Sequence, residues 1–486
     1  MSREKKESSQ PLSDKVREEL PEKAQDYIGD LEAENARLRA EIEKLKGQLL
    51  MNSHNSSKPP SSDGLKKPKT IPGSQRRSSG RKTGGQVGHA GSTLKVRENP
   101  DARVHHALSQ CAGCQLDLSG VPALGTEDRQ SFDLPPIQIQ VTEHRAEIKI
   151  CPCCGTKTTA PFPLGVDARV GYGPNLKGFA LYLQHQQLIP PRRVRDILQG
   201  ILGHRLSIGS VMLWSEVAFV RLAPFAADIV GRIIRSAVAH FDETSMRCEG
   251  DKSWLHSAST EKLTFFGIHR RRGTEAMIGF DILPHFRGTA IHDHWDPYFT
   301  FEQCSHGLCN SHILRELLFV EEVCGEKWAC FMAKLLNEIH GRVQEAKARG
   351  QIRLNLPTRL GFLEQYERIL KQGYRLHRSD PALGSGTRGP KKQCKQKNLL
   401  DRLRNRCQEI LRFMTDFEVP FTNNLSEQDI RMNKVKLKIS GCFRSFEGAE
   451  IFCRIRTYFS TWQKNGQDII QAAQAVFRGQ PLMLQA

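Results

Sequence analysis

The sequence has no hydrophobic run near the ~20 residues that a membrane-spanning helix needs, which excludes a membrane carrier. Acidic side chains are in the minority, because 53 Asp and Glu stand against 71 Lys and Arg and leave a formal net charge of +18. The charged amino terminus has no apolar core like that of a signal peptide, so we do not expect secretion. This excess of positive charge favours nucleic acid as the partner.

Disulfide bonds are not expected, although the chain has 14 cysteines, because nothing in the sequence indicates export to an oxidising compartment. Free thiols or metal ligands are the alternatives. With 486 residues, of which 38% are hydrophobic, the chain is long enough for about three or more domains with polar segments between them. The periodicity changes along the chain predict a multidomain α+β protein.

Residues 27–50 predict a coiled coil. Apolar side chains recur at a and d positions over about three heptads, and a polar residue, Asn35, occupies one a position. An asparagine in such a seam fixes the register and favours two strands at some cost in stability. Packing of an amphipathic helix against its own chain is the alternative. The apolar positions are Ile28, Leu31, Leu38, Ile42, Leu45 and Leu49.

Residues 51–100 are rich in Ser, Gly, Pro, Lys and Arg and almost free of large apolar side chains. Such a segment cannot bury enough surface to offset the entropy of ordering, so we expect a flexible basic arm. Its positive charge suits a phosphate backbone. A solvated linker is the alternative, and composition does not separate the two.

Two C-x-x-C pairs mark residues 101–165 as a metal-binding unit. Residues 137–150 between the pairs alternate like a strand. Four thiolates in two such turns are typical of a zinc ribbon, in which Zn²⁺ supplies folding energy that a small unit lacks. Cys153 is then surplus, and a redox dithiol is the competing interpretation. The expected ligands are Cys111, Cys114, Cys151 and Cys154.

Residues 166–235 are predicted to be helical. One helix is expected near 193–202, and Ser207 or Ser210 could cap a second. Two helices joined by a short glycine turn, with several arginines nearby, are compatible with a helix-turn-helix that binds DNA. An ordinary helical hairpin fits equally well.

Three carboxylates farther along the chain carry the candidate chemistry. Asp242 and Asp293 each end a short apolar run that predicts a strand. Glu427 lies near the start of a predicted helix, with Arg431 one turn later on the same face. If folding brings the three acids together, they would suit two Mg²⁺ ions, because Mg²⁺ prefers oxygen ligands and a pair of ions can cleave a phosphodiester.

Each of these acids also has a structural alternative. Glu427 follows Asn424 at capping-box spacing, so it could simply complete a helix start. The two aspartates could be turn formers at strand ends. Three neighbouring acids could replace the chosen ones, namely Glu243, Asp296 and Asp429.

Several motifs then occur together in one order, from the apolar repeat, the NSHNSSKPPSSD arm and the paired cysteines onward. They continue as FDET at 241–244, HDHWDPYF at 292–299, LCNSHILREL at 308–317 and NNLSEQDIR at 423–431. On these motifs the chain resembles the large transposase of the insertion sequence sixty-six family, from about Leu31 to Gln480.

The resemblance implies a D-D-E transposase with a ribonuclease H-like α/β catalytic core at 236–465. A helical insertion is expected within that core at about 317–421, where apolar spacing predicts three helices. A C-terminal helix and tail are expected at 466–486.

The resemblance assigns the catalytic metal, Mg²⁺ or Mn²⁺, to Asp242, Asp293 and Glu427. Many relatives have Asp-Gly-Tyr where this chain has Asp293-His294-Trp295. After the second acid, Cys309, His312 and Arg315 resemble a feature of several D-D-E transposases, which could brace the catalytic sheet or contact DNA; Arg431 is a further candidate for such a role. A helix with an inward Cys and His is the alternative. No second pair lies nearby in sequence, so a separate zinc site is not expected there.

The implied activity is binding, cleavage and strand transfer at the terminal inverted repeats of an insertion sequence. The implied partners are double-stranded DNA, at element ends and target, and further copies of the chain in a homodimer or larger multimer. Accessory proteins of the same element are additional candidates, and the expected location is the bacterial cytoplasm, at the nucleoid. Two alternatives are a transposase-derived DNA-binding protein with an inactive core and a metal-dependent nuclease that cuts without joining.

Overall fold

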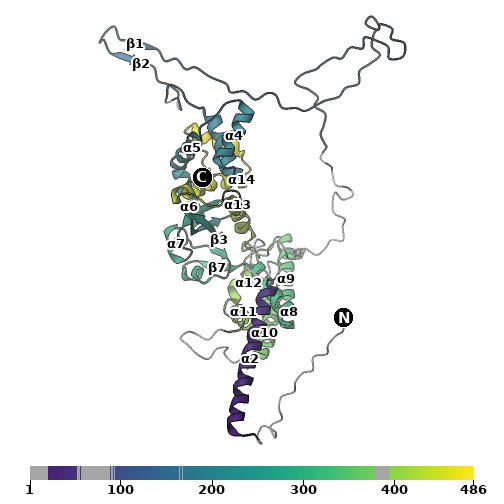
Figure 1. The fold of residues 1–486 in the computed structure, drawn as a ribbon, viewed down its shortest axis with the longest axis vertical. Helices are drawn as coiled ribbons and strands as arrows, with labels where there is room; N and C mark the ends of the chain where they lie inside the picture. Colours follow the sequence, from purple (N-terminus) through teal and green to yellow (C-terminus); the bar gives the residue numbers. More distant parts are fainter. Residues whose placement is uncertain are drawn as a thin grey trace. The chain divides into compact units, whose positions relative to one another are not determined.

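The computed structural model describes residues 20–51, 55, 88, 91, 93–163, 165–166, 168–377 and 393–485 (Figure 1). These residues form two compact units. One unit contains the described parts of 73–163 together with 191–210, and the other contains the rest. Most of the basic arm predicted at 51–100 lies outside the described residues.

The larger unit is built on a five-stranded mixed sheet in the order β5-β4-β3-β6-β7. The central strand, β3, is antiparallel to β4 and parallel to β6. At the edges, β5 is antiparallel to β4 and β7 is parallel to β6. The bounds are Val238–Cys248 for β3, Asp251–Ser259 for β4, Thr264–His269 for β5, Thr289–His292 for β6 and Ser305–Leu308 for β7.

The central strand is longer than the sequence predicted. Its hairpin to β4 turns through Glu249 and Gly250, which have φ values of 56° and 88°. A two-residue hairpin loop of type I′ needs positive φ at both positions, and glycine meets that need readily. β3 therefore continues to Cys248, and Asp242 lies within the strand instead of at its end.

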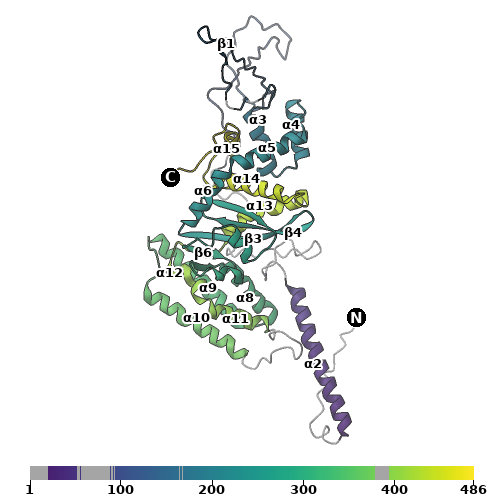
Figure 2. The same cartoon turned by 90° about the vertical axis from the view of Figure 1, so that its left-hand side faces the viewer.

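Helices pack on one face of the sheet and along its β7 edge (Figure 2). On that face α13 packs against β3 and β4, while α14 and α6 pack against β5. At the edge, a group of helices packs against β7 through α12. The bounds on the covered face are Ala223–Ile234 for α6, Asn424–Ser440 for α13 and Phe446–Lys464 for α14.

In the larger unit, α3 (Pro174–Leu181) packs against α15 (Ile469–Phe477). The helices approach so closely that a Cβ atom at Gly178 would lie 2.7 Å from the backbone nitrogen of Gln474. A short π-helix, η2 (Tyr182–Gln186), continues α3. The helix expected within 466–486 is thus α15, and it completes the core.

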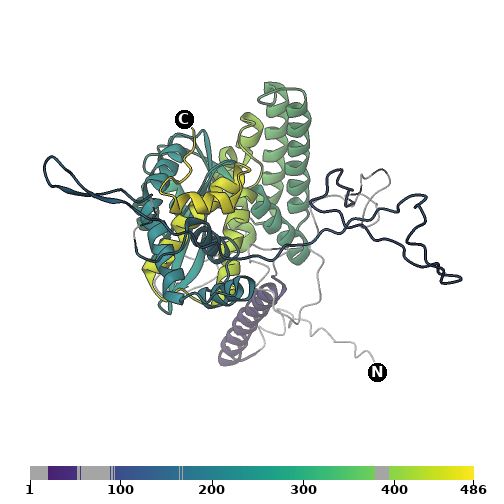
Figure 3. The ribbon, with the colours of Figure 1, turned by 90° about the horizontal axis from the view of Figure 1, so that it is seen from above.

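Five helices are described between β7 and α13, where the sequence predicted three; Figure 3 shows them in green beside the sheet. The third expected helix is broken at Arg406, whose φ of −117° leaves the helical region and whose guanidinium lies 3.6 Å from the Phe299 ring centre. The helices share an apolar core that includes Trp328 and Tyr366. Their bounds are Asn310–Cys324 for α8, Lys327–Ala348 for α9, Leu356–Leu376 for α10, Lys395–Asn405 for α11 and Cys407–Thr415 for α12.

The predicted coiled-coil segment forms one helix, α2 (Glu22–Leu50). Its apolar seam is exposed, with 42% of Leu31, 49% of Leu38 and 77% of Leu49 accessible to solvent. Asn35 Nδ2 donates a hydrogen bond to the Leu31 carbonyl of the same helix. The helix and its stripe are as expected from the repeat, while the pairing of two such helices stays a prediction.

In the smaller unit, the prediction of a strand at 137–150 is wrong except for the last three residues. Only Ile148–Ile150 form a strand, β1, which pairs antiparallel with β2 (Lys157–Thr159). Residues 137–147 have no regular structure and are almost all exposed. An alternating pattern does not make a strand unless a neighbouring segment satisfies its backbone hydrogen bonds.

The two helices expected within 166–235 are α4 (Pro191–Leu202) and α5 (Ile208–Arg221). The Ser207 hydroxyl accepts a hydrogen bond from the Ser210 backbone N–H at 2.9 Å, so Ser207 caps α5. Gly203 ends α4 with a φ of 65°. In the described part of the chain, no helix has the length and apolar character needed to cross a membrane.

Candidate active site

The central strand and its parallel neighbour bring two acids to the same edge of the sheet. His240 of β3 pairs with Ile291 of β6. Asp242 and Asp293 each follow two residues later on these strands. Because parallel strands advance together, the two aspartates lie side by side where β6 ends.

Alternation along β3 separates Asp242 from its neighbour in sequence, because successive side chains on a strand point to opposite faces. His240 and Asp242 share one face, on which His240 Nδ1 lies 2.8 Å from Asn423 Oδ1 just before α13. Glu243 points to the other face and accepts a hydrogen bond from the Tyr298 hydroxyl. Asp242 is therefore on the face that α13 covers.

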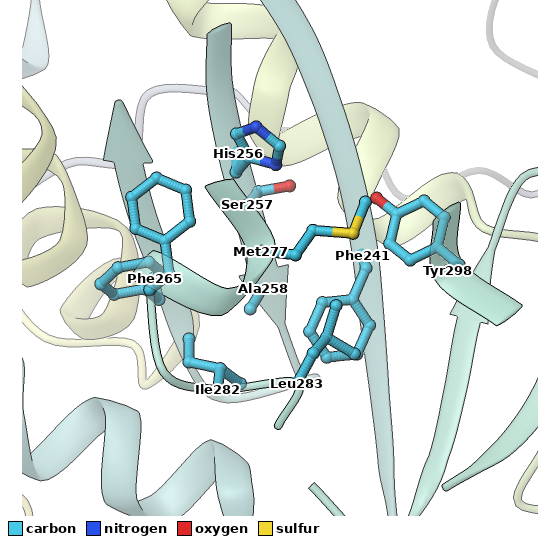
Figure 4. A pocket seen from close by; sticks show the side chains of 10 residues that line it. Phe241, His256, Ser257, Ala258, Phe265, Met277, Ile282, Leu283 and Tyr298 are labelled. Carbon is cyan, nitrogen blue, oxygen red and sulfur yellow. The ribbon is translucent and has the colours of Figure 1, made fainter. Parts of the chain in front are cut away.

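A mainly apolar cavity lies against the opposite face of β3 (Figure 4). Phe241, Met277, Leu283 and Tyr298 are among its lining residues. Figure 4 shows Phe241, Met277 and Tyr298 close together beneath the strand. A lining of this kind packs the core behind the acids and offers few groups for chemistry.

Asn423 fixes the start of α13 to the sheet. Its Nδ2 donates a hydrogen bond to the Phe241 carbonyl at 2.8 Å, and its backbone N–H donates to Cys309 Sγ at 3.1 Å. In the next turn, the Ser426 and Ser257 hydroxyls lie 2.7 Å apart. These buried contacts place Glu427, in the first turn of α13, beside the middle of β3.

The charges of the three predicted acids act on one another. The pKa of Asp242 is raised well above its ordinary value, first by burial, then by the charge of Glu243, and then by the charges of Asp293 and Glu427. Burial also raises the pKa of Asp293 and that of Glu427. The three acids, remote in sequence, are thus near enough for their charges to interact. Among the described residues, however, they do not form a group whose ligand atoms all lie within 4.8 Å of one another.

These three carboxylates fit divalent cations. They supply oxygen ligands of the kind that Mg²⁺ and Mn²⁺ prefer. Burial is the first cause of all three raised pKa values, and at Asp242 the charges of Glu243, Asp293 and Glu427 add to it. A cation bound beside these carboxylates would favour their ionised form.

Two of the three alternative acids are paired with cations. Glu243 is paired with Arg272 at 2.5 Å and bonded to Tyr298. Asp429 Oδ2 lies 2.6 Å from Lys464 Nζ and accepts from Ser259. Asp296 is exposed at the start of a short 3-10 helix, η3 (Asp296–Thr300).

The Cys-x-x-His pair at the start of α8 faces Glu427. Cys309, His312 and Glu427 each offer a ligand atom, and these atoms lie within 4.8 Å of one another. His312 Nδ1 lies 3.8 Å and Arg315 Nη2 3.9 Å from Glu427 Oε1. The sequence showed no partner for this pair, because its third member comes from a helix beyond the whole insertion.

Burial is the main influence on the protonation of these neighbours. Burial raises the pKa of the Cys309 thiol to about 11, and its sulfur accepts the Asn423 N–H. Burial, followed by the charge of Arg315, lowers the pKa of His312 to about 4, so the ring is neutral at pH 7. Arg315 and Arg431 lower the pKa of Glu427 against the effect of its burial.

In the smaller unit the two C-x-x-C segments form turns of the same geometry. The N–H of Gln115 donates to the Cys111 carbonyl, and that of Gly155 donates to the Cys151 carbonyl. Both donors have positive φ, 61° and 70°. The sequence indicated this conformation only for the second turn, which has glycine at the position.

The thiols of these turns are suited to a metal. Hydrogen bonds from Thr156, and then from Cys151, lower the pKa of Cys154 to about 7, and bonds from Cys114 and Gly113 lower the pKa of Cys111. The thiolate is the form that binds zinc. Within the described residues, however, the two pairs are not gathered into one group of ligand atoms.

One unit has buried acids on a mixed sheet, and the other has paired cysteine turns of the kind that bind zinc. The chain belongs to the transposase IS66 family, whose model matches residues 169–451. A model described as the zinc-finger binding domain of transposase IS66 matches residues 109–155, which supports a structural zinc ion. These matches make the chain a DNA-binding transposase. The resemblance drawn from the motifs is thus confirmed.

The amino-terminal part has a separate match. Residues 8–95 match a family of unknown function (DUF6444). No curated protein matches the chain.

We expect Cys111→Ser or Cys154→Ser to lower the zinc content of the purified protein and to unfold the smaller unit, because the metal supplies much of the folding energy of such a unit. Atomic absorption and protease sensitivity within 101–165 measure the two effects. Cys153→Ser is the matched control and should keep the zinc. Unchanged zinc in the Cys111 and Cys154 variants would contradict the assignment.

We expect Asp242→Asn to raise the thermal midpoint of the metal-free protein at pH 7. The folded state raises the pKa of this carboxyl, so stability is lost as the pH rises from the unfolded pKa towards the folded one. An asparagine side chain at this position cannot ionise, so the Asp242→Asn variant does not lose this stability as the pH rises. A gain of about 1 kcal/mol corresponds to roughly 2–4 °C, measurable by calorimetry in EDTA between pH 4 and 8.

Asp429→Asn is the matched control and should lower the midpoint. It removes the counter-charge of the mostly buried Lys464, 2.6 Å away, and such a loss costs about 3–5 kcal/mol. If Asp242→Asn destabilised the metal-free protein as Asp429→Asn does, the repulsion within the acid cluster would be refuted.

Proposed function

We propose that this transposase is a D-D-E enzyme with a ribonuclease H-like core, in which Asp242, Asp293 and Glu427 are the catalytic acids. The observation that supports the proposal is that the charges of Asp293, just after the parallel neighbour β6, and of Glu427, at the start of α13, act on Asp242 in the central strand. Three antiparallel strands followed by two parallel ones also fit such a core.

The three acids would hold Mg²⁺ or Mn²⁺. When bound, a pair of such ions activates an attacking oxygen and stabilises the leaving oxygen of a phosphodiester. The chain's own contribution is to hold the carboxylates rigidly, through the buried bonds of Asn423 and Ser426. Tyr298 and Phe241 exclude water from behind the strand, since both are almost fully buried.

The proposed reaction has two steps with the same chemistry. Water attacks the phosphodiester at each end of the element, which breaks one P–O bond and frees a 3′ hydroxyl. That hydroxyl then attacks a phosphodiester of the target, so one P–O bond forms as another breaks. The chain offers its acids for both steps, and no covalent bond to the protein is needed.

The residues that bind DNA are proposed to lie outside the group of three acids. Arg192, Arg193 and Arg205 are exposed on and after α4, in the unit that also contains the zinc turns. Guanidinium groups at a helix start and a following turn suit contacts with backbone phosphates. We assign to this unit the binding of the terminal inverted repeats.

The apolar seam of α2 is proposed to pair with the same seam of a second copy. Leu38, Ile42 and Leu45 are each about half exposed, at 49%, 50% and 51%. A stripe with a/d spacing and an asparagine at one a position suits a two-stranded coiled coil. A dimer formed in this way would bring the two element ends together.

We expect Asp242→Asn to abolish cleavage of a duplex that carries the element end, while end binding stays within about twofold, because the change removes metal charge and not the DNA grip. Single-turnover cleavage and gel-shift assays in Mg²⁺ measure the two properties. Asp296→Asn is the control and should cleave normally, since Asp296 is exposed at the start of η3.

Normal cleavage by Asp242→Asn would refute the catalytic assignment. Joined products between element end and target distinguish a transposase from a nuclease that only cuts. Binding without any cleavage by the wild-type chain would favour the inactive, DNA-binding alternative.

We expect the double variant Leu38→Asp, Ile42→Asp to be monomeric by sedimentation equilibrium, because two charges in the seam cannot be buried against a partner helix. Arg37→Asp lies off the seam and should leave the dimer intact. A double variant that remained dimeric would show that the seam is not the interface.

A further inference from the structure

A cavity of about 220 Å³ opens beside Asp293. Two guanidinium groups line it, from Arg272 in the loop after β5 and from Arg402 in α11 of the helical insertion. Both residues come from parts of the chain that supply no catalytic acid. Their convergence on this acid therefore calls for a role of its own.

Each guanidinium is anchored on one side by a glutamate. Arg272 Nε and Nη2 donate to Glu243 Oε1 at 2.9 and 2.5 Å. Arg402 Nη1 donates to both carboxylate oxygens of Glu316, at 2.7 and 2.8 Å. The arrangement fixes the two cations while using only part of the five N–H donors that each arginine has.

One anchor is deeply buried, while the other, Glu316, is 28% exposed and also lines the cavity. Glu243 is 1% exposed, whereas Arg272 is 35% exposed and lies 3.9 Å from the Trp295 ring centre. Arg402 is 23% exposed. Both guanidinium groups thus reach the cavity from supported positions. Nη1 of Arg272, and Nε and Nη2 of Arg402, have no hydrogen bond to any described residue.

The charges of both arginines reach Asp293. Burial raises the pKa of that carboxyl, and Arg272 and Arg402 lower it. The cavity therefore combines a catalytic acid with two fixed cations. An arginine fork matches the paired oxygens of a phosphate, and a charge-assisted bond of this kind is stronger than one between neutral groups.

We propose that Arg272 and Arg402 bind a backbone phosphate of the DNA strand that is cut, in the cavity beside Asp293. The helical insertion then contributes directly to substrate binding, through α11. The inference rests on the proposed function, because it needs a strand to be cut at the acid cluster. The alternative is that the two ion pairs only join elements of the fold.

The test compares Arg402→Gln, Arg272→Gln and wild type in single-turnover cleavage of duplexes copied from the DNA that flanks the coding sequence. In one set of duplexes a neutral methylphosphonate replaces the cut phosphate or one of its neighbours in turn. Loss of one charge-assisted contact should slow each variant about 10- to 100-fold, with end binding unchanged.

At the contacted position the methylphosphonate should slow wild type by a similar factor and slow the variants little further. Arg402→Lys keeps the charge and should recover part of the rate. Arg404→Gln, an exposed arginine on the same helix, is the matched control and should cleave normally.

Two outcomes would overturn the inference alone. In the first, both variants cleave at the wild-type rate while Asp242→Asn is inactive. In the second, their defects are unchanged at every methylphosphonate position, as expected for a structural role. A wild-type chain that cleaves no duplex would overturn the proposed function, and this inference with it.

Discussion

The arrangement of the acids depends on one buried side chain, Asn423. Its amide bonds the central strand at Phe241 and meets His240, while its backbone N–H bonds Cys309 at the start of α8. A group of carboxylates repels itself, so other contacts must hold its members in place. Satisfied polar contacts in the interior are strong and specific enough to do so. These contacts of Asn423 fix the position of Glu427, on which the proposed chemistry depends.

Much of the candidate site was predictable, because its signals are local. Short apolar runs marked β3 and β6. The choice between Asp242 and Glu243 could not be made from the local sequence. It depends on which face of β3 meets α13, and alternation decides it only once that helix is placed. The capping-box interpretation of Asn424 and Glu427 was wrong, because the residue that caps α13 is Asn423 and no side chain among the described residues makes a capping hydrogen bond there.

The sequence failed where a partner from elsewhere in the fold decides the outcome. The pattern at 137–150 alternates, yet only three residues found a neighbouring strand. β3 ran beyond Asp242 because a glycine turn lets it pair with β4. Arg272 and Arg402 carried no motif at all, since one lies in a loop and the other in an inserted helix. Only the fold brings these arginines to the same cavity as Asp293. In the same way, only the fold brings Cys309 and His312 close to Glu427.

The position of the insertion between the second acid and the third has a consequence for the growing polypeptide. As the ribosome releases the chain, the cysteine turns and the arginine-bearing helices emerge first, and the two aspartates follow. The remaining acid leaves the ribosome only after α8 to α12 have emerged. A nascent or prematurely ended product would therefore hold the proposed DNA-gripping parts without a complete set of ligands, and would compete for element ends that it could not break.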